Sequence, residues 1–128
     1  MGILSKIFTW WDGATIGTAL YSARKGMSVG SDDAGNRYYQ SRDGTRRWVI
    51  YEGANDASRV SPDWHGWLHH THDGEPDSYL PPVRGFEAEA IPNLTGTNAA
   101  YRPAGALERG GRRARATGDY EAWSPDAK

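Results

Sequence analysis

Cysteine is absent from the 128-residue chain, so disulfides, thiolate metal sites and cysteine nucleophiles are excluded. Leucine, isoleucine, valine and phenylalanine together number only 17 residues. Their share of about 13% lies below the roughly 20% at which a chain begins to resemble a disordered one. We therefore do not expect an enzyme with a large core and a deep pocket.

The chain also lacks an excess of one charge, a long apolar run and a targeting segment. Its 15 basic and 16 acidic residues leave a net charge of −1, which argues against a protein that chiefly binds nucleic acid. No apolar stretch approaches the roughly 20 residues of a membrane-spanning helix. The apolar run over residues 3–11 is too short and too interrupted for a signal-peptide core, so we expect no targeting segment.

Aromatic residues take the place of the missing aliphatic ones: there are six tryptophans, seven tyrosines and two phenylalanines. Flat rings suit a small sheet together with extended segments that complete their burial on a partner. The sequence divides into three predicted parts, residues 1–17, 18–73 and 74–128.

The first part, residues 1–17, carries one apolar stripe with helical spacing. The stripe consists of Ile3, Leu4, Ile7, Phe8 and Trp11, and it ends at Asp12-Gly13. A helix this short is marginal alone in water, so it requires a surface to pack on. That surface is a partner's groove, a membrane interface or the domain's own sheet, and we interpret the segment as a docking helix.

The second part, residues 18–73, predicts an antiparallel meander of three or four strands followed by one short helix. Glycine-containing turns separate candidate strands over residues 21–24, 27–31, 37–42 and 45–52. In the last strand Trp48 and Ile50 share one face, and Val49 and Tyr51 share the other. Because both faces are apolar, one of them is expected to meet something outside the sheet.

Ser61-Pro62-Asp63 predicts the start of the helix, since it offers an N-cap hydroxyl, a proline at the first helical position and an early acid. We expect this helix to run as far as Asp73-Gly74. Residues 74–128 then contain seven glycines and six prolines, which predicts a long, extended, irregular C-terminal arm. The fold class is α+β. The arm carries widely spaced anchors, namely Tyr79, Phe86, Leu94, Tyr101, Leu107, Tyr120 and Trp123.

Two patterns could indicate a binding site, namely a group of histidines and an arginine-rich segment. His65, His69 and His72 would share a face if the helix continued through them, as a zinc or copper site could use. We expect instead a structural role in hydrogen bonding and no bound metal. Residues 109–115, rich in arginine and glycine, resemble segments that contact RNA. Acidic residues follow closely, so a solvated linker or a clamp on an acidic protein surface is favoured, and no enzyme signature is found.

Four motifs stand in a fixed order along the chain. They are Val29-Gly30-x-Asp32-x-x-Gly35-Asn36-x-Tyr38-Tyr39, Arg47-Trp48-Val49-x-Tyr51, Pro62-x-Trp64-His65-x-Trp67-Leu68-His69-His70 and Asn93-x-Thr95-Gly96-Thr97-x-x-Ala100-Tyr101-x-Pro103. Together they closely resemble the small accessory subunit of respiratory complex I (NADH:ubiquinone oxidoreductase) whose paralogue is the assembly factor mimitin. The resemblance covers residues 2–101 in full and the tail less strongly. Residues 116–123 look like the α-proteobacterial form.

The resemblance implies a non-catalytic subunit on the hydrophilic arm of a proton-pumping NADH:quinone oxidoreductase, supporting its assembly and stability. It implies no flavin, iron–sulfur cluster or quinone in this chain, and we expect no other cofactor. The balanced charge leads us to expect no nucleic-acid partner. The implied neighbours are the subunit with two tetranuclear iron–sulfur clusters and the quinone-module subunits. The implied location is peripheral, on the cytoplasmic face of the bacterial inner membrane, with possible membrane contact through the N-terminal helix. The alternative is a free-standing binding module, either RNA-binding or assembly-factor-like.

No residue is expected to be catalytic, to bind a cofactor or to ligate a metal. The expected docking or structural residues are Trp11, Gly35, Asn36, Tyr38, Tyr39, Arg47, Trp48, Tyr51, Trp64, His65, Trp67, Leu68, Asn93, Thr95, Gly96 and Tyr101.

Overall fold

The computed structural model describes residues 13–126. Its elements are α2 (Ile16–Lys25), β1 (Gly26–Ser31), β2 (Arg37–Ser41), β3 (Arg47–Ile50), a 3-10 turn (Ala57–Arg59), α3 (Pro62–Leu68), α4 (Pro76–Tyr79) and a second 3-10 turn (Leu107–Arg109). The three strands form one antiparallel sheet in the order β1-β2-β3. The predicted α+β class is confirmed, with three strands. None of the described helices is long and apolar enough to cross a membrane.

The region before the sheet differs from the prediction. The expected strand over residues 21–24 is wrong, because these residues form the second half of helix α2. Thr15 caps that helix, and its hydroxyl accepts a hydrogen bond from the Thr18 N–H at 3.2 Å. Arg24 and Lys25 occupy the last turn, where positive charge offsets the helix dipole. The predicted helix of residues 1–17, including Trp11, lies almost wholly outside the described residues.

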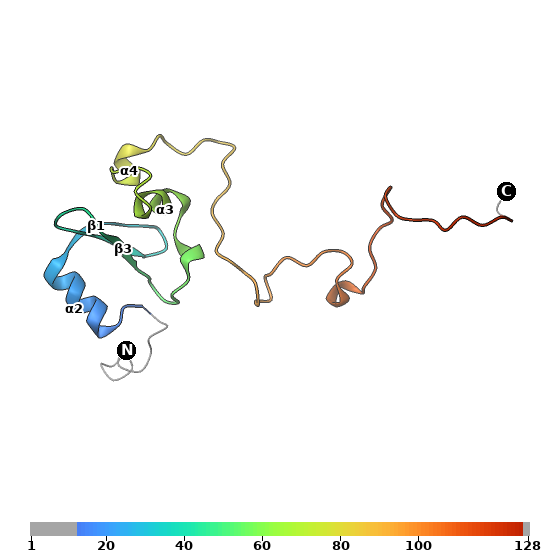
Figure 1. Ribbon diagram of the computed structural model, residues 1–128, viewed down its shortest axis with the longest axis horizontal. Helices are drawn as coiled ribbons and strands as arrows, with labels where there is room; N and C mark the ends of the chain where they lie inside the picture. Colours follow the sequence, from blue (N-terminus) through green and yellow to red (C-terminus); the bar gives the residue numbers. More distant parts are fainter. Residues whose placement is uncertain (1–12, 127–128) are drawn as a thin grey trace. The chain divides into compact units, whose positions relative to one another are not determined.

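The sheet presents two faces, and each is covered by a helix. In the register of β2 with β3, Tyr38 pairs with Val49 and Tyr39 pairs with Trp48. Because side chains alternate along a strand, these two pairs lie on opposite faces. Figure 1 shows α2 and α3 on opposite sides of the sheet. The predicted alternation in β3 is therefore confirmed, and the surface that meets the second face is α2.

The core is small and aromatic. Tyr38, Trp64 and Trp67 form a buried cluster, and four partly buried side chains pack around it, namely Val29, Val49, Val60 and Leu68. The scarcity of aliphatic residues is thus compensated by three large rings.

The chain divides into two compact units, Met1–Asn93 and Leu94–Lys128. The first holds the sheet, α2, α3 and α4. Residues 94–126 of the second contain turns and the 3-10 turn Leu107–Arg109 but neither a strand nor an α-helix. The limits of the predicted C-terminal arm, residues 74–128, stay a prediction.

Candidate docking site

Two tryptophans of α3 close over one tyrosine of β2. The ring of Tyr38 stacks on Trp64 with centroids 4.0 Å apart, and Trp67 meets both rings edge-on. Trp64 also lies directly against the backbone of β1, since a Cβ added at Gly30 would come within 2.8 Å of its indole. Glycine at position 30 is therefore required for α3 to approach the sheet.

Arg47 fixes the segment that follows α3. Its side chain is only 5% exposed. One guanidinium nitrogen donates to the carbonyl oxygens of Trp67 and His72, at 2.7 and 2.9 Å, and the other donates to Asp73 Oδ1 at 2.8 Å. The guanidinium also lies over the Trp67 ring, 4.7 Å from its centroid. Arg47 thus joins β3 to the last turn of α3 and to the loop beyond it by three charge-assisted hydrogen bonds.

Asn36 is the centre of a second buried network. Its side chain is completely buried, and its amide donates to Asp32 Oδ2 at 2.9 Å and to the Arg59 carbonyl at 3.0 Å. Its oxygen accepts from the Glu52 N–H at 3.1 Å. The neighbouring Gly35 has φ +84°, a conformation that favours glycine. This network ties the β1–β2 turn to the two segments that follow β3.

Asp32 connects the network to the aromatic cluster. The Tyr38 hydroxyl donates to Asp32 Oδ2 at 2.7 Å. Burial is the main cause that raises the pKa of Tyr38 far above its usual value, and the Asp32 carboxylate raises it further. Tyr38 therefore stays neutral and acts as a hydrogen-bond donor.

The opposite face of the sheet carries a looser aromatic group. Trp48 is half-buried, stacks on Tyr39 with centroids 6.1 Å apart, and meets Tyr21 of α2 at 5.4 Å. Its indole N–H donates to Ser22 Oγ at 2.9 Å. Tyr51 is also half-buried, and burial together with the charge of Asp56 raises its pKa.

Helix α3 ends at Leu68, five residues before Asp73, so the predicted helix end is wrong. The cause is His70, which has φ +57° and cannot continue the helix. His65, His69 and His72 consequently do not share a helix face.

The histidine rings are used in local contacts. His65 and His69 stack with centroids 4.0 Å apart. The two ring nitrogens of His72 face the carbonyl oxygens of Gly74 and Asp63, at 3.0 and 3.2 Å. Among residues 13–126, no group of three histidine or acidic side chains could hold a metal ion.

The last motif belongs partly to each unit. The Asn93 N–H donates to Ser58 Oγ at 2.9 Å, which holds the end of the first unit against the 3-10 turn at residues 57–59. Gly96, with φ +83°, shapes the turn that follows, and Thr95 precedes it. The Tyr101 side chain is 87% exposed.

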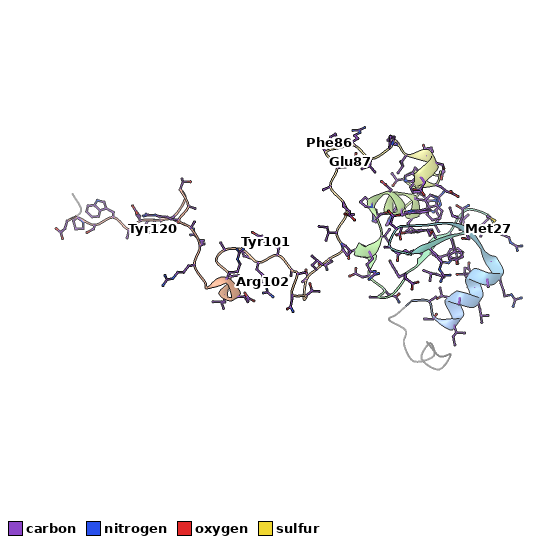
Figure 2. The ribbon with its side chains drawn as sticks, turned by 180° about the vertical axis from the view of Figure 1, so that it is seen from behind. Met27, Phe86, Glu87, Tyr101, Arg102 and Tyr120 are labelled. Carbon is purple, nitrogen blue, oxygen red and sulfur yellow. The ribbon has the colours of Figure 1, made fainter. Side chains whose placement is uncertain are left out.

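Large apolar side chains stand exposed in both units. In the first unit they include Ile16 and Leu20 on one side of α2, and Phe86, which is 79% exposed. In the second unit Tyr101, Leu107, Tyr120 and Trp123 are each more than 80% exposed. Figure 2 labels Phe86, Tyr101 and Tyr120. So much exposed aromatic area is characteristic of a surface that binds another protein.

Two arginines of the arginine-rich segment pair with acidic residues of the same unit. Arg113 pairs with Asp119, and Arg115 pairs with Glu121. Half of the four arginines in residues 109–115 thus have an acidic partner, which weakens the interpretation as an RNA-binding segment.

The predicted set therefore separates into two kinds of residue. The structure brings together Tyr38, Arg47, Trp64, Trp67 and Leu68 on one face of the sheet, and Tyr39 and Trp48 on the other. Gly35 and Asn36 form the adjoining turn, whereas His65 and Tyr101 are exposed.

The predicted set omits two features. One is Asp32, although its four-residue spacing to Asn36 across a glycine-containing turn is typical of a side chain that caps its own turn. The other is α2, which Thr15 and the i,i+4 pair of Ile16 and Leu20 could have indicated.

Residues 26–125 match the model of one protein family, described as NADH ubiquinone oxidoreductase subunit NDUFA12. The chain belongs to this family. The resemblance inferred from its four motifs is confirmed.

Individual NDUFA12 relatives agree with the family match. Subunit 12 of the NADH dehydrogenase 1 alpha subcomplex of Dictyostelium discoideum is 41% identical over 83 residues, which are 61% of this chain and 60% of the relative. The corresponding subunit of Bos taurus is 40% identical over 93 residues, 62% of this chain and 64% of the relative. An uncharacterised protein of Rickettsia prowazekii, an α-proteobacterium, is 42% identical over 48 residues, 33% of this chain and 48% of its own length. The chain spans about three fifths of the length of the curated relatives it matches first.

Proposed function

We propose that this chain is a non-catalytic accessory subunit of the hydrophilic arm of a proton-pumping NADH:quinone oxidoreductase, and that it supports the assembly and stability of that complex. The observation that carries the proposal is the NDUFA12 family match over residues 26–125. Two features of the molecule support it. The aromatic cluster is closed by the chain's own side chains, and exposed rings in both units are available to neighbouring subunits.

The proposed neighbours are the subunit with two tetranuclear iron–sulfur clusters and the subunits of the quinone module. The proposed location is peripheral, on the cytoplasmic face of the bacterial inner membrane. Residues 94–126 support a role in spanning several neighbours, because they carry four exposed anchors and no strand or α-helix of their own. Contact of residues 1–17 with the membrane stays a prediction.

The test uses a bacterium that contains both this chain and the NADH:quinone oxidoreductase. The chain is deleted there and then restored with a tagged full-length copy. On a native gel the tagged chain should co-migrate with membrane NADH dehydrogenase activity. Without the chain, less assembled complex should form, while the remainder retains its flavin and clusters. A tagged chain that stays soluble would contradict the proposal. So would a deletion strain with a normal amount of complex that cannot transfer electrons.

Two substitutions separate docking from folding. Tyr101→Ala removes a ring that is 87% exposed, so the isolated chain should unfold at an unchanged urea concentration while co-migration weakens. Trp67→Ala empties a position that is 1% exposed and should cost about 3–5 kcal/mol of folding free energy as well as incorporation. Asn98→Ala, an exposed change in the same unit as Tyr101, is the matched control and should affect neither. Normal incorporation of the Tyr101 variant would exclude Tyr101 as a docking residue.

A further inference from the structure

Four cationic side chains gather at one corner of the first unit. Strand β1 begins directly after α2, and its first residue, Gly26, pairs with Ser41 at the end of β2. The last turn of α2 therefore meets the turn that joins β2 to β3. Between them lies a pocket of about 710 Å³, and its lining includes Arg24, Lys25, Arg42 and Arg46.

These four side chains differ from five of the nine other lysines and arginines in residues 13–126. Arg47, Arg84, Arg102, Arg113 and Arg115 each pair with a carboxylate. Within residues 13–126 the side chains of the four pocket cations form no ion pair and no hydrogen bond. Unpaired positive charge is thus concentrated in a chain whose net charge is −1.

The pocket contains one carboxylate, that of Asp43, and its hydrogen bonds are made within the turn. It accepts hydrogen bonds from the hydroxyl of Ser41 and from the hydroxyl and N–H of Thr45. These bonds lower the pKa of Asp43, which keeps it ionised at neutral pH. Four cations and one carboxylate leave three net positive charges around the pocket.

The local fold explains only half of this cluster. Arg24 and Lys25 offset the negative end of the α2 dipole. Arg42 and Arg46 flank a turn and have no helix end to offset, although like charges at close range repel. Several converging donors around a concave space suit a compact anion that has several oxygen acceptors.

We propose that this basic pocket binds a phosphate group, supplied by the head group of an anionic phospholipid or by free phosphate. The cations of α2 and of the β2–β3 turn approach the phosphate oxygens from two sides. The inference rests on the geometry of the pocket and stands independently of the proposed function.

The test uses the full-length chain and two probes. One probe is inorganic phosphate, titrated by NMR chemical shifts of residues 21–27 and 41–46. The other is sedimentation with vesicles of phosphatidylcholine, with or without phosphatidylglycerol. The double variant Arg42→Gln/Arg46→Gln should abolish the phosphate-induced shifts and weaken binding to phosphatidylglycerol vesicles about 30-fold, as expected for two lost cations. The side chains substituted in this variant, and in the control variant described next, form no ion pair and no hydrogen bond among residues 13–126. The urea concentration at which the chain unfolds should therefore be unchanged.

The matched control is Arg37→Gln/Arg112→Gln, which removes the same charge from two residues that do not line the pocket and should retain nearly all binding. The two probes distinguish the sources: sedimentation with phosphatidylglycerol vesicles indicates a lipid head group, and chemical shifts caused by inorganic phosphate without such sedimentation indicate free phosphate. Binding of either probe that is lost only in the pocket variant supports the proposal. Equal losses in pocket and control variants would show a non-specific charge effect and overturn it. Absence of binding to both probes would also overturn it.

Discussion

Replacing Asn36 by Asp exchanges one NH2 group for an oxygen at a completely buried position. In the native turn that NH2 group donates to Asp32 Oδ2 at 2.9 Å and to the Arg59 carbonyl at 3.0 Å. The new carboxylate retains the acceptor for the Glu52 N–H but presents an oxygen to two other oxygens. The substitution is nearly isosteric, so its effect isolates the hydrogen bonds from the packing.

The magnitude follows from the two lost donors. The Arg59 carbonyl is left unsatisfied, which costs about 1–3 kcal/mol, and the Asp32 carboxylate loses one hydrogen bond worth about 1.5–3 kcal/mol although it keeps the bond from the Tyr38 hydroxyl. Asn36→Asp should therefore lower the free energy of unfolding by about 2.5–6 kcal/mol at neutral pH. Repulsion from Asp32 adds to this cost and raises the pKa of the introduced carboxyl above its unfolded value of about 3.9. A raised acid pKa means that the folded state binds the proton more tightly. The penalty is therefore smallest below about pH 4 and grows as the pH rises.

Urea unfolding of the full-length chain, followed by tryptophan fluorescence, measures this cost at acidic and neutral pH. Asn98→Asp makes the same chemical change at an exposed position and should alter the free energy of unfolding by less than about 0.5 kcal/mol. If Asn36→Asp were as mild as that control at neutral pH, the buried network would not stabilise the fold. A penalty that stayed constant with pH would refute the electrostatic part of the reasoning.

Two further predictions concern the second unit and the histidines. In the isolated chain, the amide hydrogens of residues 94–126 should exchange with solvent almost at once, because no strand or α-helix protects them. In the assembled complex the same amides should become protected. If the isolated chain protected all of them in one cooperative transition, the segment would not depend on a partner. The double variant His65→Gln/His69→Gln should leave assembly largely intact and the purified chain free of stoichiometric metal, whereas one zinc ion per chain, lost together with assembly in that variant, would show a metal site.

The three-stranded sheet was predictable because its turn residues and its alternation agree with each other. Gly35 and Gly44 both adopt positive φ in the turns where glycine was expected to end a strand. In β3, Trp48 and Val49 point to opposite faces as period-two spacing requires. Ser61 and Pro62 likewise mark the start of α3, because a proline at the first helical position is preset for it.

Two element ends could not be predicted in the same way. Residues 21–24 are too few to distinguish strand from helix by periodicity. The predicted boundary between residues 1–17 and 18–73 also falls inside α2, so these residues were assigned to a different part of the chain from Thr15, whose side chain caps the helix. Helix α3 ends at Leu68 because His70 adopts a left-handed conformation, which a histidine adopts far less readily than a glycine. The hydrogen bonds from Arg47 to the Trp67 and His72 carbonyls stabilise that early end. They join residues that are 20 and 25 positions apart in the sequence, so a local pattern does not reveal them.

The motif residues of the candidate site differ in burial, and this difference separates residues needed for the fold from residues that the fold does not explain. Asn36 and Tyr38 are completely buried within the chain and their side chains form hydrogen bonds there, so the fold accounts for them. Tyr101 stands in an equally specific motif, yet 87% of it is exposed and the fold gives it no role. An exposed aromatic ring gains free energy only when it is covered, by about 1.5–3 kcal/mol for a large apolar side chain. Burial therefore separates the residues that build the domain from those, such as Tyr101, for which we propose a docking role.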